Sequence, residues 1–170
     1  RWFGTNTDIT ELRNAHAALK QSEARYRALY DSIDEGFGII EVMFDEHMGA
    51  VDFRFLETNP AFERQTGIQN ARGQRMREIA PQHEMHWFDL FGTIALSGEP
   101  KRFEYPAVEL HRWYEGYAYR VGEEYERKVG IIFNDITVRK QAEEKLRQSE
   151  QRLRLALSAG QMGAWDIDLL

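Results

Sequence analysis

A segment that occurs twice constrains this chain more than any other feature of its 170 residues. The tripeptide Asp-Ile-Thr at 8–10 recurs 127 residues later at 135–137, and residues 8–28 align with 135–155 without a gap. The two copies share ten identities in 21 positions. A repeat with a long fixed period indicates successive copies of one module. We therefore expect the chain to span one complete module between parts of two others.

The repeated segment has the pattern of an α-helix. In the first copy Leu12, Leu19 and Tyr26 lie seven residues apart, and in the second copy Leu146 and Leu153 do the same. Charged residues flank this seam, which is typical of a helix that packs against another helix. Small and polar residues also occupy the seam, so a coiled coil built on it is expected to be marginally stable. A helix that lies on its own domain stays open as the alternative.

The position of the repeat predicts five segments. They are the tail of a preceding module at 1–8, an N-terminal linker helix at 9–33, a core at 34–135, a C-terminal linker helix at 136–159 and the start of a following module at 160–170. We expect Thr10 and Thr137 to cap the first turns of the two helices, because a hydroxyl oxygen can accept from the free N–H groups there.

The core has the pattern of an α+β fold. We predict strands at 37–44, 51–58, 101–110, 112–121 and 128–134. Asn59 and Pro60 begin a short helix that Gly67 ends, short helical turns follow at 68–80, and a longer helix is expected from Pro81 to Ser97. This order favours an antiparallel sheet with helices on one face. The first strand is apolar on both faces, so the N-terminal helix or a partner subunit is expected to cover the second face.

Composition argues against several function classes. The chain has no cysteine, and therefore no disulfide, thiolate metal site or thiol nucleophile. Its 22 basic and 28 acidic residues give a net charge of −6, which does not favour nucleic acid as a partner. No apolar run reaches the roughly 18 residues of a membrane helix, so we expect no membrane contact within this chain. No phosphate-binding loop or nucleophile triad is evident, and we predict a chain without catalytic residues.

Five short motifs lie around the predicted strands and helices. They are Ser-Glu-Ala-Arg-Tyr-Arg at 22–27, Glu-Gly-Phe at 35–37, Thr-Asn-Pro-Ala-Phe at 58–62, Thr-Gly at 66–67 and Gly-Ile-Ile-Phe-Asn-Asp-Ile-Thr at 130–137. In these motifs, residues 24–140 resemble a PAS domain. The flanks resemble parts of two further PAS domains. The resemblance implies a five-stranded antiparallel sheet with short helices on one face, long linker helices at both ends and a small cavity between sheet and helices.

The resemblance is strongest to PAS modules that follow one another in bacterial sensor histidine kinases, and weaker to those of cyclic-di-GMP enzymes. It implies a cytoplasmic sensory or signal-relay module of a two-component system, in a parent protein that can be associated with a membrane. The implied partners are neighbouring PAS and output domains, a small-molecule ligand and a second copy of the chain, which would form a homodimer through the flanking helices. The alternative is an assembly module that binds no ligand.

The cofactor stays open at this point. Without cysteine, the chain cannot carry a cysteine-linked chromophore. Haem would need an axial histidine on the long helix, for which His83 and His86 are the candidates, and a flavin held without a covalent bond is the other option. His83 and His86 lie three residues apart with no evident third ligand, so we predict no metal site.

Aromatic residues mark the expected ligand pocket. The residues predicted to face the space between sheet and helices are Phe55, Phe62, His83, Trp87, Phe91, Trp113, Tyr117 and Phe133. Trp113, Tyr117 and Tyr119 share one face of a strand, because side chains alternate along a strand with a period of two. Such rings either fill a core or line an apolar pocket for a planar ligand. Of the two, we expect a filled or nearly filled cavity.

The junction between the last strand and the C-terminal helix is the expected relay. Asp135 and Thr137 lie where the strand becomes helix. A movement of the core that leaves through this junction would reach the next module, and plain capping of the helix is the alternative role.

Overall fold

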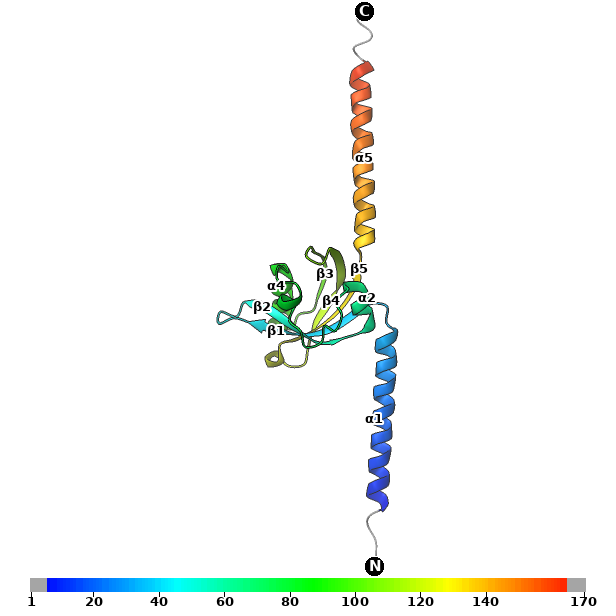
Figure 1. The fold of residues 1–170 in the computed structure, drawn as a ribbon, viewed down its shortest axis with the longest axis vertical. Helices are drawn as coiled ribbons and strands as arrows, with labels where there is room; N and C mark the ends of the chain where they lie inside the picture. Colours follow the sequence, from blue (N-terminus) through cyan, green and yellow to red (C-terminus); the bar gives the residue numbers. More distant parts are fainter. Residues whose placement is uncertain (1–5, 165–170) are drawn as a thin grey trace, which may run out of the picture.

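Five strands form the centre of the molecule, and two long helices leave it in opposite directions (Figure 1). This computed structural model describes residues 6–164, and the side chains of 8–160. The strands are β1 (Gly36–Phe44), β2 (Ala50–Thr58), β3 (Lys101–Ala107), β4 (Arg112–Val121) and β5 (Lys128–Asp135). They form one antiparallel sheet of five strands, as the sequence predicts, and the structure gives their order as β2-β1-β5-β4-β3.

Short helices cover one face of the sheet, and long helices flank the core. The short ones are α2 (Pro60–Thr66), α3 (Met76–Ile79) and α4 (Met85–Ser97), with a 3-10 turn at Glu124–Glu126. The long ones are α1 (Asn6–Ser32) and α5 (Thr137–Ala164). The α+β class and the flanking helices are therefore confirmed. Among residues 6–164, no helix combines the length and apolar composition that crossing a bilayer requires.

Local sequence signals explain α2. The side chain of Asn59 accepts from the N–H of Phe62 at 2.8 Å, and Pro60 occupies the first turn, where a missing N–H costs nothing. Gly67 ends the helix with φ 77°, a left-handed conformation that glycine adopts without a steric penalty. Both predicted helix limits are confirmed.

The core lies between the inner face of the sheet and α4. Ile40 and Val42 on β1 face Phe88 and Ile94 of α4, and all four are almost fully buried. Gly92 allows this approach, because a Cβ at this position would lie 2.6 Å from the Cβ of Ala50 on β2. The sheet and α4 are thus separated only by their side chains, which determines how much space is left between them.

Three predictions for the elements of the core are wrong in part. The helix α4 begins at Met85 and not at Pro81, because the backbone turns at His83, whose N–H donates to Ala80 O. The strand β3 ends at Ala107 and not at 110, since a turn closed by the N–H groups of Leu110 and His111 follows it. Of the turns expected at 68–80, only α3 is helical.

The long helices also differ from their predicted limits. Thr10 lies inside α1, which the structure describes from Asn6 onwards, so Thr10 is not the cap. The helix α5 continues through Gly160 to Ala164, past the limit expected at 159. Residues 1–5 of the expected preceding tail and residues 165–170 of the expected following strand lie outside the described residues.

The outer face of the sheet carries partly exposed apolar residues that α1 does not cover. Phe37 and Ile39 of β1, Tyr117 of β4 and Ile132 of β5 are partly exposed there. Helix α1 runs away from the sheet (Figure 1). Only its last turn makes a ring contact with Phe37, through Tyr30, at 5.3 Å between centroids. The sequence leaves two candidates for covering this face, the N-terminal helix and a partner subunit. The structure shows that the N-terminal helix does not cover it.

We expect Asn59→Ala to destabilise the core by about 3 kcal/mol, because it removes several buried hydrogen bonds at once. Asn59 accepts from the N–H of Phe37 at 2.9 Å and of Phe62, and donates to Glu35 O at 3.0 Å. Urea unfolding measures the effect. Gln82→Ala, at an exposed position, is the control and should stay within about 0.5 kcal/mol. Equal stability of the two variants would contradict the structural role of Asn59.

Candidate functional site

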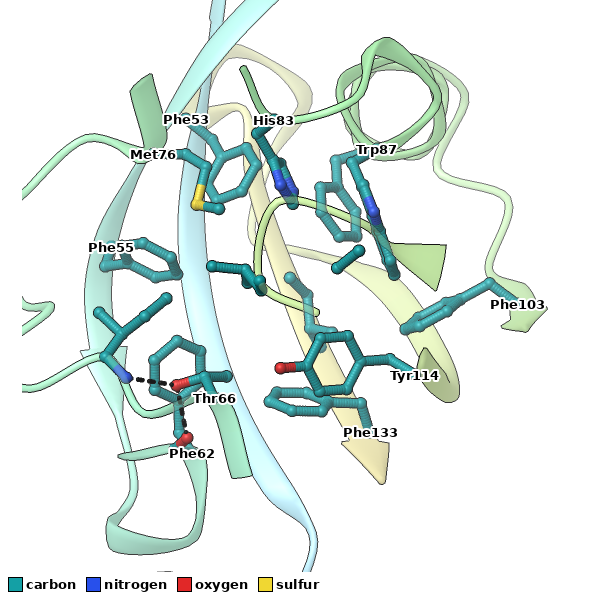
Figure 2. A pocket seen from close by; sticks show the side chains of 15 residues that line it. Phe53, Phe55, Phe62, Thr66, Met76, His83, Trp87, Phe103, Tyr114 and Phe133 are labelled. Atoms are coloured by element: carbon teal, nitrogen blue, oxygen red, sulfur yellow. Dashed lines mark hydrogen bonds between the residues drawn. The ribbon is translucent and has the colours of Figure 1, made fainter. Parts of the chain in front are cut away.

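A small apolar cavity lies between α4 and the inner face of the sheet. Its volume is about 70 Å³. It is lined by Phe53, Phe55, Phe62, Thr66, Ile68, Met76, His83, Trp87, Phe91, Phe103, Ala107, Leu110, Tyr114, Ile131 and Phe133 (Figure 2). Six of the eight residues predicted for the pocket are among them. The cavity is what remains of a nearly filled core.

Edge-to-face ring contacts hold the cavity walls. Phe53 meets Phe55 at 5.4 Å between centroids, Phe55 meets Phe62 at 5.2 Å, and Phe62 meets Phe133 at 5.7 Å. Phe133 in turn meets Tyr114 at 5.1 Å. Such geometry brings the positive edge of one ring to the negative face of the next and adds to the energy of burial. The walls are therefore well packed, and the cavity is a defined space.

His83 is the one imidazole in the cavity wall. Its ring stacks on Trp87 at 5.9 Å between centroids, with 13° between the planes, and it points into the space beside Phe53 (Figure 2). The side chain is only 5% exposed. Burial lowers the pKa of His83 to about 4, against a weaker opposite effect of the Glu84 carboxylate. The imidazole is therefore neutral near pH 7.

Trp113 and Tyr117 were predicted to line the cavity, and this prediction is wrong. Both lie on the opposite face of β4, where they are partly exposed, and Tyr119 lies there with them. The inner face of β4 carries Tyr114 and Ala118, which are buried. Both faces of β4 carry aromatic rings. The face that packs beneath α4 is the one that also carries the small residues Gly116 and Ala118.

Several cavity residues were missed in the sequence. Tyr114 was missed because the aromatic alternation of β4 was assigned to the wrong face. Phe53 and Phe103 were missed although they follow the inward period of β2 and β3. The signal that could have corrected β4 is Gly116: a Cβ there would lie 2.7 Å from the Phe103 ring, so glycine marks a close approach on the inner face.

The cavity does not fit haem or a flavin. Pockets for ligands of that size measure roughly 300–1,000 Å³, whereas this cavity measures about 70 Å³. His83 also lies in the turn before α4 and stacks on Trp87, while a ring nitrogen of His86 lies 3.2 Å from Pro106 O. Within residues 6–164, no group of three potential ligands is arranged to hold a metal ion.

Asp135 ties β5, β4 and α5 together at the predicted relay. One carboxylate oxygen accepts from the N–H of Thr137 at 2.9 Å and from its hydroxyl, and the other pairs with Arg112 Nη1 at 2.6 Å. The hydroxyl oxygen of Thr137 accepts from the N–H of Trp113 at 2.9 Å. Asp135 thus supplies the cap at the start of α5. Thr137 does not cap through its own side chain, because its hydroxyl joins the helix to β4.

Gln65 connects the two helix junctions, and the sequence gave no reason to select it. Its Nε2 donates to Asp34 O, just after α1, at 2.7 Å. Its Oε1 accepts from the N–H of Asp135, just before α5, at 2.8 Å. The hydroxyl of Tyr114, a cavity residue, donates to the backbone oxygen of Gln65 at 3.4 Å. One residue of α2 therefore touches both junctions and lies beside the cavity wall.

Ion pairs orient the first turn of α5. Arg139 Nη2 lies 2.9 Å from Glu115 on β4 and 3.3 Å from Glu104 on β3. Lys140 also pairs with Glu104 and lies over the Trp113 ring, 5.2 Å from its centroid. Exposed ion pairs contribute little individually. As a network that spans two strands and the helix, they favour one direction of α5.

Comparisons with known proteins agree with this architecture. No family model matches the sequence. The chain is similar to the PAS domain of an HTR-like protein from Haloarcula marismortui, with a TM-score of 0.53 and 17% identity over 73% of this chain and 99% of that one. It is also similar to an RNA-binding light-oxygen-voltage receptor, with a TM-score of 0.51 and 18% identity over 83% of this chain and 39% of that one. The chain has the PAS fold.

We expect the stability of the protein to fall between pH 6.5 and pH 4 because of His83. In this range the unfolded chain takes up a proton at this imidazole and the folded chain does not, so the free energy of unfolding decreases as the pH falls. The loss reaches about 3 kcal/mol at pH 4. Urea unfolding as a function of pH measures it.

The comparison that isolates this effect uses two variants. His83→Phe should remove the His83 contribution from the pH profile, whereas His86→Phe should keep it. Identical profiles for wild type and His83→Phe would show that the folded protein takes up the proton as readily as the unfolded chain.

Proposed function

We propose that this chain is a sensory or signal-relay PAS module of a bacterial signal-transduction protein with several PAS modules. In it, a change at the cavity or in the packing of a dimer alters the direction of α5. The position of Gln65 carries the proposal, because this side chain bonds to both helix junctions and its backbone oxygen bonds to a cavity residue.

The cavity has two short connections to α5. The first runs from the Tyr114 hydroxyl to Gln65, and from the Gln65 side chain to the N–H of Asp135. The second runs along the chain, because Leu110 lines the cavity and Arg112, two residues later, pairs with Asp135. Both connections meet at Asp135. A displacement of either cavity residue is thus expected to change the hydrogen bonds that fix the start of α5.

The connection to α1 is built in the same way. Asn59 Nδ2 donates to Tyr30 O at 3.4 Å, and Gln65 Nε2 donates to Asp34 O. These bonds attach the end of α1 to the beginning and the end of α2. A signal that arrives through α1 therefore has a route to α2, and from α2 to the start of α5.

The repeat supports a place in a longer array. Since 8–28 matches 135–155, α1 and α5 occupy equivalent positions around successive modules. In the proposed function, one module's C-terminal helix is the next module's N-terminal helix. A sensor histidine kinase of a cytoplasmic two-component pathway is the parent that this arrangement and the PAS resemblance favour, with a cyclic-di-GMP enzyme as the alternative. The chain itself would contribute no catalytic residue.

A second copy of the chain is the partner that fits the flanking helices. Leu12, Leu19 and Tyr26 on α1, and Leu146 and Leu153 on α5, are each more than half exposed. A row of apolar residues at heptad spacing favours contact with an equivalent helix. The same exposed residues support the second candidate function, an assembly module that forms dimers and binds no ligand.

Gln65→Met tests the relay. It keeps the length of the side chain but removes both side-chain hydrogen bonds, so we expect amide exchange at Asp135 and in the first turn of α5 to become about five- to tenfold faster. Hydrogen exchange followed by NMR measures this. Gln69→Met, the same substitution at an exposed position just after α2, is the control. In the full-length parent, Gln65→Met should change the output, and an unchanged output with an intact fold would overturn the relay.

Leu19→Asp tests the dimer. A carboxylate in the seam of α1 should shift the protein from dimer to monomer, because association would bury its charge. Sedimentation velocity measures the change, and Gln21→Asp on the same helix adds the same charge away from the seam. A dimer that persists in Leu19→Asp would contradict a contact through this seam.

A further inference from the structure

Helix α5 runs away from the core (Figure 1), and one stripe of its free part carries small and apolar residues. Leu146 and Leu153 are each more than half exposed, and Ala142, Ser149 and Ala156 alternate with them and are exposed as well. Spacings of four and three residues bring these side chains onto one side of the helix, in the pattern by which two helices pack against each other. We call these residues the α5 seam.

The α5 seam has a limit at each end. One heptad before its first leucine the same position holds Arg139, whose guanidinium pairs with Glu115 on β4 at 2.9 Å and with Glu104 on β3 at 3.3 Å. One heptad after its second leucine the position holds Gly160, which has no side chain to pack. The seam therefore spans 142–156, roughly 22 Å of helix. The first turn of α5 belongs to the sheet, and the seam is left for a second helix.

Opposite charges flank the two edges of the α5 seam. Lys145 comes just before a seam leucine, at the position called g in a heptad, and Glu150 comes just after Ser149, at the position called e. Within the described side chains, 8–160, neither has an ion-pair partner, whereas Glu144 outside the seam pairs with Arg147 at 2.8 Å. Lys145 and Glu150 cannot pair within one helix, because only residues three or four apart are neighbours on its surface. Both charges are therefore free for a neighbouring helix.

The orientation of that neighbour decides whether the charges attract or repel. In a parallel pair of identical helices, position g of one helix faces position e of the next heptad on the other, so Lys145 faces the partner's Glu150, and symmetry gives this pair twice. In an antiparallel pair, g faces g and e faces e, which brings Lys145 to the partner's Arg152 and Glu150 to the partner's Glu143. The alternation of leucines and small residues allows either orientation. Charge therefore selects the parallel one.

We propose that residues 142–156 form a parallel, in-register coiled coil with the same residues of a second copy, and that Lys145 and the partner's Glu150 determine its orientation. The proposal rests on the proposed function in taking a second copy as the partner. It deepens that function by giving the contact an orientation, a register and two limits along α5.

The charge order is a property of α5 and not of the repeat. In the first copy of the repeated segment Glu23 corresponds to Glu150, but Ala18 stands at the position of Lys145. Helix α1 therefore lacks this pair, although its own seam is equally exposed. Of the two long helices, α5 is the one whose sequence specifies the direction of a partner helix.

Disulfide trapping measures the orientation, because the chain has no cysteine and each variant then carries a single thiol. Ala142→Cys and Ala156→Cys place the thiol at either end of the α5 seam. In a parallel, in-register pair each thiol lies opposite its own copy, so both variants should form disulfide-linked dimers under mild oxidation. In an antiparallel pair the two positions cannot both lie opposite their own copies. Gln151→Cys, exposed on the other side of the helix, is the control and should crosslink about tenfold more slowly.

Charge reversal tests the pair itself. In the Ala142→Cys protein, Lys145→Glu should slow crosslinking about fivefold, because like charges then meet twice across the seam. Glu150→Lys should have the same effect, and the two reversals together should restore the original rate. Arg154→Glu makes the same change of charge as Lys145→Glu at an exposed position outside the seam. As the control, it should leave the rate within about twofold.

The proposal is overturned if either seam cysteine crosslinks no faster than Gln151→Cys, or if the combined reversal does not recover the rate lost in the single reversals. A dimer in sedimentation velocity that fails these tests refutes the parallel coil and leaves the dimer of the proposed function. The relay is tested separately, because Gln65→Met is followed by amide exchange at the start of α5, before the seam begins. Crosslinking at both seam positions with no effect of Gln65→Met would support the coil and refute the relay.

Discussion

The packing of aromatic rings between one sheet face and α4 is the constraint on which the rest of the structure depends. Trp87 illustrates it, since its ring contacts Phe91, Phe103 and Tyr114 at 5.2 to 6.4 Å and its N–H donates to Pro106 O at 3.1 Å. Rigid rings can interlock in only a few ways. Gly92 lets α4 approach the sheet so closely that the rings between them have to interlock. The small size of the cavity follows from this packing. So does the neutral state of His83, because a ring enclosed by other rings has no water to stabilise a charge.

The sequence predicts the elements of this fold well where the signals are local. Asn59, Pro60 and Gly67 delimit α2 because capping depends on residues within one turn. It fails where two alternatives satisfy the same period. On β4 the alternation places Trp113 and Tyr117 on one face and Tyr114 on the other, and period alone does not say which face meets α4. The decision lies in Gly116 and Ala118, whose small size suits the crowded side. The six predicted pocket residues that do line the cavity all come from segments other than β4.

The polar bonds that join distant segments could not be predicted from the pattern. Gln65 lies in a short amphipathic helix where a glutamine has no special meaning, yet its amide reaches Asp34 and Asp135, which are separated by a hundred residues of chain. Only the folded sheet brings these backbone groups together, because β1 and β5 are antiparallel neighbours and β1 begins beside the end of β5. Periodicity reports how a segment faces the core. It carries no information on which backbone groups are left unpaired at the ends of elements, and Asn59 and Gln65 fulfil that need.

Apolar burial stabilises the core, and polar bonds fix the helix junctions. This difference determines which part of the molecule can move. The core is held by apolar burial, whereas α1 and α5 touch it only through the turns next to it: their seam residues are exposed, and their directions depend on a few contacts at the two junctions. Each such bond contributes about 1 kcal/mol. A rearrangement of one or two of them is therefore within the range of a small ligand or a change of partner, while the core stays folded. Because α5 has 28 residues, it extends roughly 40 Å from its first turn. A small change of angle at Asp135 consequently becomes a displacement of several ångströms at the far end of the helix.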